Sequence, residues 1–187
     1  GIPISLWGES GYTPDIAVDR LGSAHIVWRG GNRDIWYARV GPNNTFEKSP
    51  MVIVSADARD PKVAVDYDGN AHIITLPFSV QSQSFLTYLK IDRVGTTVVR
   101  NSFVIYDTWP QSTDAIQNAR YHGPAITISP KQGRFLPLVA AEFHLTASLP
   151  TNPLEPNGPK KSFYRDGIAV VTLNEAGIPI RDYTWEP

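Results

Sequence analysis

A two-strand unit that occurs twice with nearly the same residues restricts the fold of this chain more than any other feature. The first copy covers residues 13–28 and the second residues 60–74, about 47 positions further along. Each copy contains a proline, the triplet Ala-Val-Asp, a glycine and the pair Ala-His, in that order. A fainter third copy covers residues 123–139. Internal repeats of this length predict one supersecondary unit that is stacked several times.

Each copy has the residues of a β-hairpin rather than those of a helix. Proline comes first, where a strand does not need its N–H, and Ile16 and Val18 alternate with Ala17 at the period of two that a half-buried strand requires. An aspartate, Asp19 or Asp66, stands three residues before a glycine. We expect each carboxylate to accept backbone N–H groups of a tight turn, and each glycine to adopt a positive φ.

The same pattern, followed along the chain, predicts four strands in each copy. Four-stranded units that recur every ~45 to 60 residues are typical of β-propeller blades. We therefore predict an all-β fold, in which a single repeat domain over residues 1–187 contains three propeller-type blades and one N-terminal strand of a preceding blade. Residues 110–118 are expected to form a polar loop before the third blade. The expected blades and the extra strand lie at about 13–55, 60–106, 123–185 and 2–7.

The repeated hairpin can be written Pro-x-Ile/Val-Ala-Val-Asp-x-x-Gly-x-Ala-His-Ile, at residues 14–26 and 61–73. It resembles the repeat of sialidase-like, BNR-type β-propellers, and this resemblance extends over nearly the whole chain. The resemblance implies the propeller fold. It does not extend to the sialidase site, because the Asp box Ser-x-Asp-x-Gly-x-x-Trp and an Arg-Ile-Pro motif are both missing from the sequence.

Three blades are fewer than the roughly four to eight that closed propellers use. Isolated blades would leave apolar strand residues against water, so we expect the chain either to form a homo-oligomer or to join further blades of a longer chain. The apolar strand residues that isolated blades would expose are Ile16, Val18, Val63, Val65, Ile126 and Ile128.

The first residues, Gly1-Ile2-Pro3, lack a methionine and are expected to result from processing or excision.

One end of a propeller carries the connections between blades and the loops that join second and third strands; we call it the loop face. Arginine can grip carboxylates or vicinal hydroxyls, and tyrosine can stack on the apolar face of a sugar ring, so these residue types predict a site for a glycan or glycoconjugate. Asn32, Asp60 and residues 146–161 are expected on the same face. The candidate ligand-binding residues are Tyr12, Arg29, Arg33, Arg59, Arg120, Tyr121 and His122.

The histidines divide into two groups. His25 and His72 follow the Asp-Gly turns at equivalent positions and are expected to be structural, each with a hydrogen bond to the backbone of a neighbouring blade. His122 and His144 lie with Tyr164 in the third copy, and this set loosely resembles the base and acid groups of propeller-type polysaccharide lyases. The alternative to a binding module is therefore a carbohydrate-active enzyme, either a lyase or a glycosidase, with these three residues as its catalytic groups.

The remaining signals exclude other classes of function. The net charge of −1 gives no electrostatic footprint for nucleic acid, and the longest apolar runs are too short for membrane insertion. No motif predicts a metal or a cofactor. The proline-rich residues 149–159 are expected to contact a partner. We predict a non-enzymatic carbohydrate-binding or assembly module, extracellular or surface-exposed, with a structural surface or viral appendage domain as a further alternative.

Overall fold

The computed structural model describes residues 11–55, 57–78, 85–103, 116–131, 134–150 and 160–180. Every regular element in this part of the chain is a β-strand, and none of it forms a helix that could cross a membrane. The strands are β1 (Tyr12–Val18), β2 (Ala24–Arg29), β3 (Ile35–Val40), β4 (Phe46–Val54), β5 (Ala58–Val65), β6 (Ala71–Pro77), β7 (Leu86–Ile91), β8 (Thr97–Phe103), β9 (Ile116–Lys131), β10 (Arg134–Pro150), β11 (Lys160–Leu173) and β12 (Pro179–Ile180).

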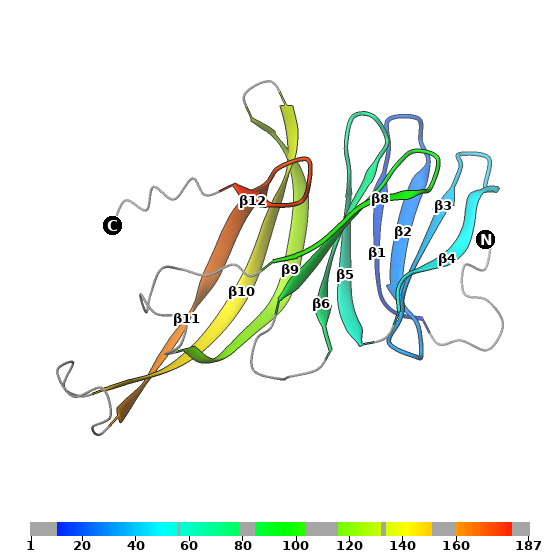
Figure 1. Cartoon of the computed structure of the whole chain (residues 1–187). Coiled ribbons are helices and arrows are strands. Elements are labelled where there is room, and N and C mark those ends of the chain that lie inside the picture. Colours follow the sequence, from blue (N-terminus) through cyan, green and yellow to red (C-terminus); the bar gives the residue numbers. More distant parts are fainter. Residues whose placement is uncertain are drawn as a thin grey trace.

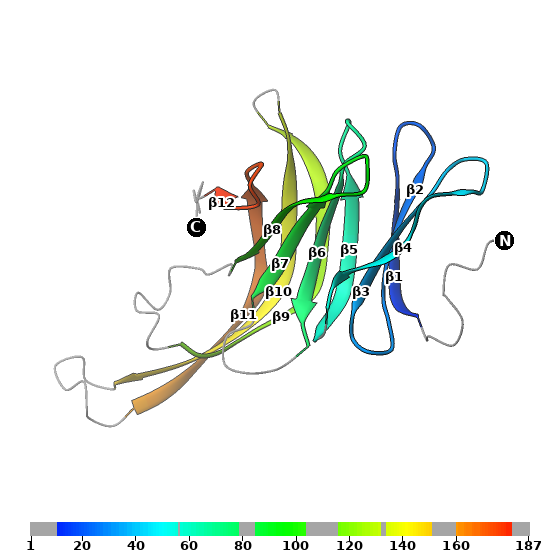
Figure 2. The ribbon, with the colours of Figure 1, turned by 45° about the vertical axis from the view of Figure 1, so that its right-hand side comes forward.

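These strands form three antiparallel sheets of four strands, each in simple up-and-down order along the chain. We call them blades 1, 2 and 3; they contain β1–β4, β5–β8 and β9–β12. The blades stand face to face, and the first strands β1, β5 and β9 are neighbours in space (Figures 1 and 2). The predicted all-β fold of four-stranded, propeller-type blades is confirmed. The expected strand at residues 2–7 lies outside the described residues.

One type of turn closes hairpins in all three blades. In the second blade Asp66 Oδ1 accepts the backbone N–H groups of Asp68 at 3.0 Å and Asn70 at 2.8 Å, and Gly69 has a φ of 83°. The prediction for Asp66, and the same prediction for Asp19, is confirmed. Because the side chain supplies the acceptor that the turn needs, the turn fixes the strand register without help from packing. The turns begin and end at Asp19 and Gly22, Asp66 and Gly69, Asp92 and Gly95, and Asn174 and Gly177.

The first strand of each blade contains a second repeated feature, a residue with positive φ directly before a proline. Thr13, Asp60 and Gly123 have φ values of 47°, 50° and 50°. The pairing of all three strands with their neighbours shifts register at or beside this point. Such a β-bulge bends a strand and stores strain when the residue is not glycine. The bulges at Thr13 and Asp60 lie at the loop-face ends of β1 and β5, whereas the bulge at Gly123 lies in the middle of β9.

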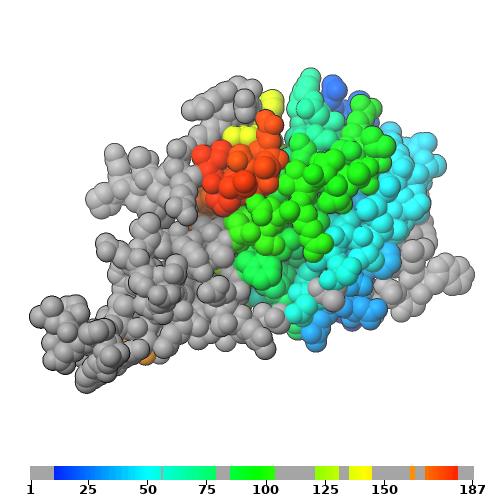
Figure 3. Space-filling model, in the orientation of Figure 1, coloured from blue at the N-terminus to red at the C-terminus, as the bar shows by residue number. Residues whose placement is uncertain are grey.

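Two apolar cores fill the spaces between the blades, one on each face of the middle sheet. Between blades 1 and 2, Val27, Ile35 and Tyr37 pack against residues that include Ile73 and Leu89, and all five are fully buried. Figure 3 shows the side chains of blade 2 in direct contact with the β11–β12 hairpin of blade 3. The core between blades 2 and 3 contains Ile74, Leu76, Leu86, Tyr88, Phe103, Tyr121, Val139, Ala141, Phe143, Ala169, Val171 and Leu173.

The two end faces of the stack expose apolar side chains. Ile16 and Val18 on the outer side of blade 1 are 60% and 62% exposed, and Ile168 and Val170 on the outer side of blade 3 are 68% and 49% exposed. Val63, by contrast, is covered by blade 1 and only 6% exposed. The expectation of solvent-facing apolar residues therefore applies to the ends of the stack and not to its interior.

Blade 3 differs from the sequence-based prediction in the length of its strands. The third blade was expected to begin at about residue 123, but its first strand covers Ile116–Lys131, its second covers Arg134–Pro150, and β11 begins at Lys160. Residues 116–118 were predicted as a loop, and residues 146–150 were predicted as part of another. Both are paired instead, because the ladder continues through Ala147 opposite Ile116 and Pro150 opposite Lys160. The result is an arm that projects beyond the other blades (Figure 1), while residues 151–159 lie outside the described part.

Candidate functional site

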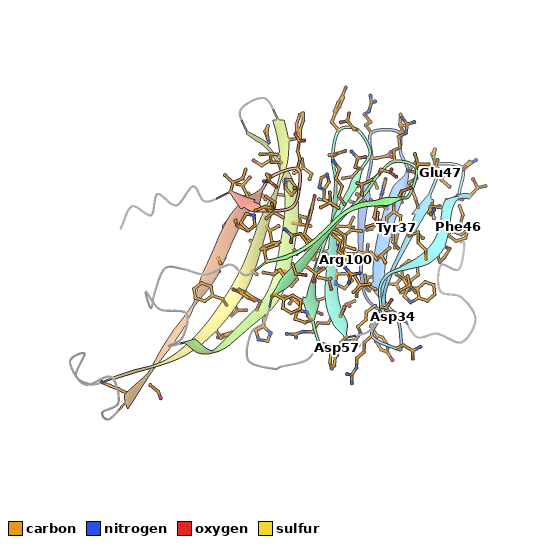
Figure 4. All side chains as sticks on the ribbon, in the orientation of Figure 1. Asp34, Tyr37, Phe46, Glu47, Asp57 and Arg100 are labelled. Carbon is orange, nitrogen blue, oxygen red and sulfur yellow. The ribbon has the colours of Figure 1, made fainter. Side chains whose placement is uncertain are left out.

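Side chains from blades 1 and 2 meet at the loop face. The turn between β2 and β3 and the short link between β4 and β5 both lie there, as Asp34 and Asp57 show at the lower ends of the strands in Figure 4. Tyr12 pairs with Arg29 across β1 and β2. The structure therefore brings together two predicted ligand-binding residues, and Arg33 follows in the adjacent turn.

These residues form an alternating stack of aromatic rings and guanidinium groups, which we call the loop-face stack: Tyr12, Arg29, Phe78 and Arg33. The Cζ atom of Arg29 lies 4.8 Å from the ring centroid of Tyr12 and 5.6 Å from that of Phe78. The Cζ atom of Arg33 lies 4.0 Å from the Phe78 centroid. Each cation–π contact at a partly exposed site stabilises its geometry by about 0.5–1 kcal/mol. The stack therefore holds two flexible arginine side chains in defined positions.

Backbone contacts between the blades hold the stack in place. The N–H of Ala58 donates to the carbonyl of Arg33 at 3.0 Å, and the N–H of Phe78 donates to the carbonyl of Asp57 at 2.6 Å. Arg33 and Asp57 have φ values of 65° and 62°, a conformation that costs about 1 kcal/mol or more in a residue other than glycine. Strained residues of this kind cluster at functional sites more often than elsewhere.

The charges of the stack are only partly compensated. Arg33 Nη1 lies 3.5 Å from Asp57 Oδ1, and about half of each side chain is exposed, so this ion pair is weak. Arg29 has no ion pair among the described residues, and its buried Nε–H finds no acceptor there. A site with one unpaired guanidinium and two rings can bind a flat or anionic partner.

Two further predicted ligand-binding residues, Arg59 and Tyr121, make contacts that connect the blades. Arg59 Nε donates to the carbonyl of Pro77 at 3.2 Å, and its Nη2 donates to the carbonyl of Tyr121 at 3.3 Å in blade 3. Tyr121 itself is fully buried in the core between blades 2 and 3. Its position follows from the early start of β9, which turns a predicted loop residue into a strand residue that faces the core. Arg59 and Tyr121 therefore connect blades, and Tyr121 presents no ring to solvent.

The residues of the alternative catalytic set lie on blade 3. The rings of His122 on β9 and His144 on β10 are 5.4 Å apart at their centroids, edge to face. His144 Nε2 is 3.5 Å from Glu142 Oε1, and both side chains are about half exposed. Tyr164 pairs with Thr146 in the ladder of the arm. The side chains of Tyr164 and of the predicted ligand residue Arg120 lie outside the described part of the structure.

Two buried Asp–His–Tyr hydrogen-bond chains, which we call the relays, resemble catalytic triads but have a structural role. In blade 2 His72 Nε2 lies 3.0 Å from Asp66 Oδ2, and its Nδ1 lies 2.7 Å from the hydroxyl of Tyr88. Since the carboxylate accepts the Nε2–H, Nδ1 must accept the proton of the phenol. His72 and Tyr88 are 3% and 0% exposed, so no substrate reaches either side chain.

Blade 1 contains the same relay with looser geometry. His25 Nε2 lies 3.4 Å from Asp19 Oδ2, and His25 Nδ1 lies 2.9 Å from the hydroxyl of Tyr37. Burial raises the pKa of Tyr37 to about 12, which keeps the phenol protonated and able to donate. A structural role for His25 and His72 was predicted, but the expected partner, a neighbouring blade's backbone, was wrong. The alternation that brings His25 to the face of Tyr37 provides a partner on the adjacent strand of the same blade.

The relays should make the protein sensitive to acid. Burial lowers the pKa of His25 by more than its Asp19 partner raises it. Burial raises the pKa of Asp66, but the His72 ring and Asn70 lower it further, so the net pKa lies well below its ordinary value. Both shifts mean that the unfolded chain binds more protons than the folded one as the pH falls.

We therefore expect the free energy of unfolding to decrease as the pH falls below about 6.5, where unfolded histidine begins to bind a proton, and to decrease more steeply below about 3.8, where unfolded aspartate does. Urea unfolding measured from pH 8 to pH 3 checks this. His25→Asn removes one titrating group and should flatten the first part of the curve. If the free energy of unfolding increased as the pH was lowered from 6.5 to 5, the lowered pKa of His25 would be contradicted.

Known proteins provide few comparisons for this chain. No protein-family model matches the sequence, and no curated protein is significantly similar to it. Among solved structures the fold is similar to that of a GH43 β-1,3-galactosidase with galactodeoxynojirimycin, at a TM-score of 0.47 and 15% sequence identity. That likeness covers 92% of this chain and 45% of the galactosidase chain, so the chain spans about half the length of that structure. Among the described residues no three histidine, aspartate or glutamate side chains are grouped to hold a metal ion.

Proposed function

We propose that this chain is a non-enzymatic carbohydrate-binding module whose binding site is the loop-face stack. The observation that carries the proposal is the sequence of contacts from Tyr12 through Arg29 and Phe78 to Arg33. An exposed ring offers an apolar surface to the flat side of a pyranose, and a held guanidinium offers paired donors to hydroxyl or carboxylate oxygens. Acidic sugars such as uronates fit best, because Arg29 has no ion pair among the described residues.

Binding is favoured over catalysis by the state of the acidic groups on this face. A glycosidase needs two carboxyl groups on either side of the scissile bond, one of them able to donate a proton. Asp57 faces Arg33 at 3.5 Å, and Asp60 faces Arg59 at 3.7 Å. Both carboxylates are thus engaged by arginines, an arrangement that suits a fixed binding surface.

The first test is a glycan array on the purified chain, followed by calorimetric titration with any saccharide that binds. Phe78→Ala removes the ring that both arginines contact, and should weaken binding by about tenfold, since one aromatic contact is worth roughly 0.5–1.5 kcal/mol. Arg29→Ala should do the same for acidic sugars and less for neutral ones. Absence of saccharide binding at millimolar concentration would refute the proposal.

The end of the blades opposite the loop face offers a matched control. Arg20 lies with its Cζ atom 4.6 Å from the ring centroid of Tyr67, which is 60% exposed. This pair has the same chemistry as the loop-face stack but stands on the Asp-Gly turns. Tyr67→Ala should leave saccharide affinity unchanged, and an equal loss in both variants would show that binding is not specific to the loop face.

A lyase remains a second candidate because His122 and His144 do come together. A histidine at the edge of a site can remove the proton next to a uronate carboxylate, after which the leaving group departs and a double bond forms. Incubation with uronate-containing polysaccharide tests this through the ultraviolet absorbance of unsaturated products. Activity that survives His122→Ala and His144→Ala would exclude both residues as the base.

A further inference from the structure

The two ends of the blade stack are not alike. We call the side of blade 1 that exposes Ile16 and Val18 the front face, and the side of blade 3 that exposes Ile168 and Val170 the back face. Their exposed fractions range from 49% to 68%. Contiguous apolar side chains on an exposed sheet face are uncommon in a monomer, because their contact with water is unfavourable. A neighbouring sheet that covers them removes this cost.

The sequence repeat permits a direct comparison of a covered and an uncovered front face. Ile16 and Val63 occupy the same position of the repeat, two residues after the proline of the first strand. Val63 is 6% exposed because it packs on blade 1 in the core that also contains Val27. Ile16 is 60% exposed. Blade 1 packs on this position in the second copy, whereas among the described residues no other sheet packs on Ile16.

The two contacts between blades are formed by equivalent surfaces. The front of blade 2 packs on the back of blade 1, and the front of blade 3 packs on the back of blade 2. In each contact the first strand of the later blade contacts the first strand of the earlier one: β1 with β5, and β5 with β9. On the front of blade 1 the side chains of β1 are exposed, while Ile26, Trp28 and Ala38 on the neighbouring strands are buried. The exposed part of this face is therefore the complement of a surface like the exposed back of blade 3.

We propose that two copies of this chain associate head to tail, with the front face of each on the back face of the other. The arrangement repeats the established blade contact twice, around a two-fold axis. It gives six blades, within the range of roughly four to eight in which propellers close. Because the second contact forms within an assembly that the first has already made, the ring is much more stable than either contact alone.

Light scattering coupled to size exclusion tests the proposal over a range of concentrations. The expected mass is twice the 20.7 kDa of one chain, with dissociation on dilution. Ile16→Glu and Ile168→Glu place a charge on the front and back faces, and each should reduce association at least tenfold. Val94→Glu is the matched control, because Val94 is 79% exposed on the turn between β7 and β8 and lies on neither face.

A second measurement does not depend on disrupting the contact. The chain contains no cysteine, so a single introduced thiol reports its own accessibility. Ile16→Cys and Ile168→Cys should react slowly with an alkylating reagent at high protein concentration and quickly after dilution, while Val94→Cys should react quickly at both. Circular dichroism confirms that each variant is folded.

The outcomes separate the alternatives. A wild-type chain of single mass at all micromolar concentrations overturns the proposal, and so does a Glu variant that still assembles. Masses that grow beyond two copies also overturn it, because they indicate an open head-to-tail array instead of a ring. Protection of both thiols in an assembly of double mass supports it. Loss of saccharide binding in a variant that still forms the double-mass assembly would bear on the loop-face stack alone.

Discussion

Replacing Gly177 with alanine is expected to lower the free energy of unfolding by about 3 kcal/mol, more than any other single methyl group added to the described glycines. Gly177 has a φ of 71°, which costs any residue with a Cβ roughly 1–2 kcal/mol. A Cβ there would also lie 2.6 Å from Cε1 of Tyr88 in blade 2. The Tyr88 ring is fully buried and bonded to His72, so it cannot yield without further loss.

Urea unfolding measures the effect of Gly177→Ala as a shift of the midpoint at constant slope. Gly31→Ala is the control, since no atom lies within 4 Å of the position its Cβ would take and its φ is not positive. That variant should change stability by less than ~0.5 kcal/mol. Equal midpoints for the two variants would show that the β11–β12 turn does not pack on blade 2 as described. The hydrogen bond from Asn101 Nδ2 to the Gly177 carbonyl, at 3.2 Å, fixes the same contact.

His72→Ala is expected to lower the free energy of unfolding by about 3 kcal/mol as well, for a different reason. The substitution leaves the hydroxyl of Tyr88 buried without a partner and removes the imidazole from Asp66, whose carboxylate is 10% exposed. Each unsatisfied buried group costs about 1–3 kcal/mol. A cavity of ring size adds to the loss.

Tyr88→Phe separates these contributions, because it removes only the hydroxyl and should cost about 1 kcal/mol. His25→Ala provides a graded comparison in blade 1, where the distance from histidine to aspartate is 3.4 Å instead of 3.0 Å. The smaller loss should come from blade 1. If His25→Ala were the more damaging variant, the ring packing and not the relay would dominate the stability of both sites.

The parts of this fold that sequence could predict are those fixed by local chemistry. Asp19 and Asp66 form their turns with neighbours a few residues away, so a short motif contains everything that the turn needs. Alternation of apolar residues located the strands for the same reason. The blades follow from the repeat of the hairpin motif.

The parts that sequence could not predict depend on contacts between blades. Phe78 joins the loop-face stack only because blade 2 places its ring over the turn of Arg33 in blade 1. Arg59 was assigned to a ligand but reaches the carbonyl of Tyr121 in blade 3. The sequence does show that Phe78 is an aromatic residue directly after the second strand of blade 2. Its part in the site could be recognised only once the relative positions of blades 1 and 2 were known.

The residue with positive φ before proline in each first strand affects where residues can be inserted into the chain without a change of strand register. On the strand side of Thr13, Asp60 and Gly123 a single inserted residue would exchange the core and solvent faces. On the loop side of Thr13 and Asp60 an insertion mainly lengthens a connection, because the bulge absorbs the break in register. Gly123 differs, because β9 is already paired from Ile116 onwards. The link before β5 covers residues 55–57, and the bulge at Asp60 follows near the start of that strand. In β1 and β5 the bulge thus acts as a boundary at which the loops can be lengthened or replaced while the strands keep their alignment.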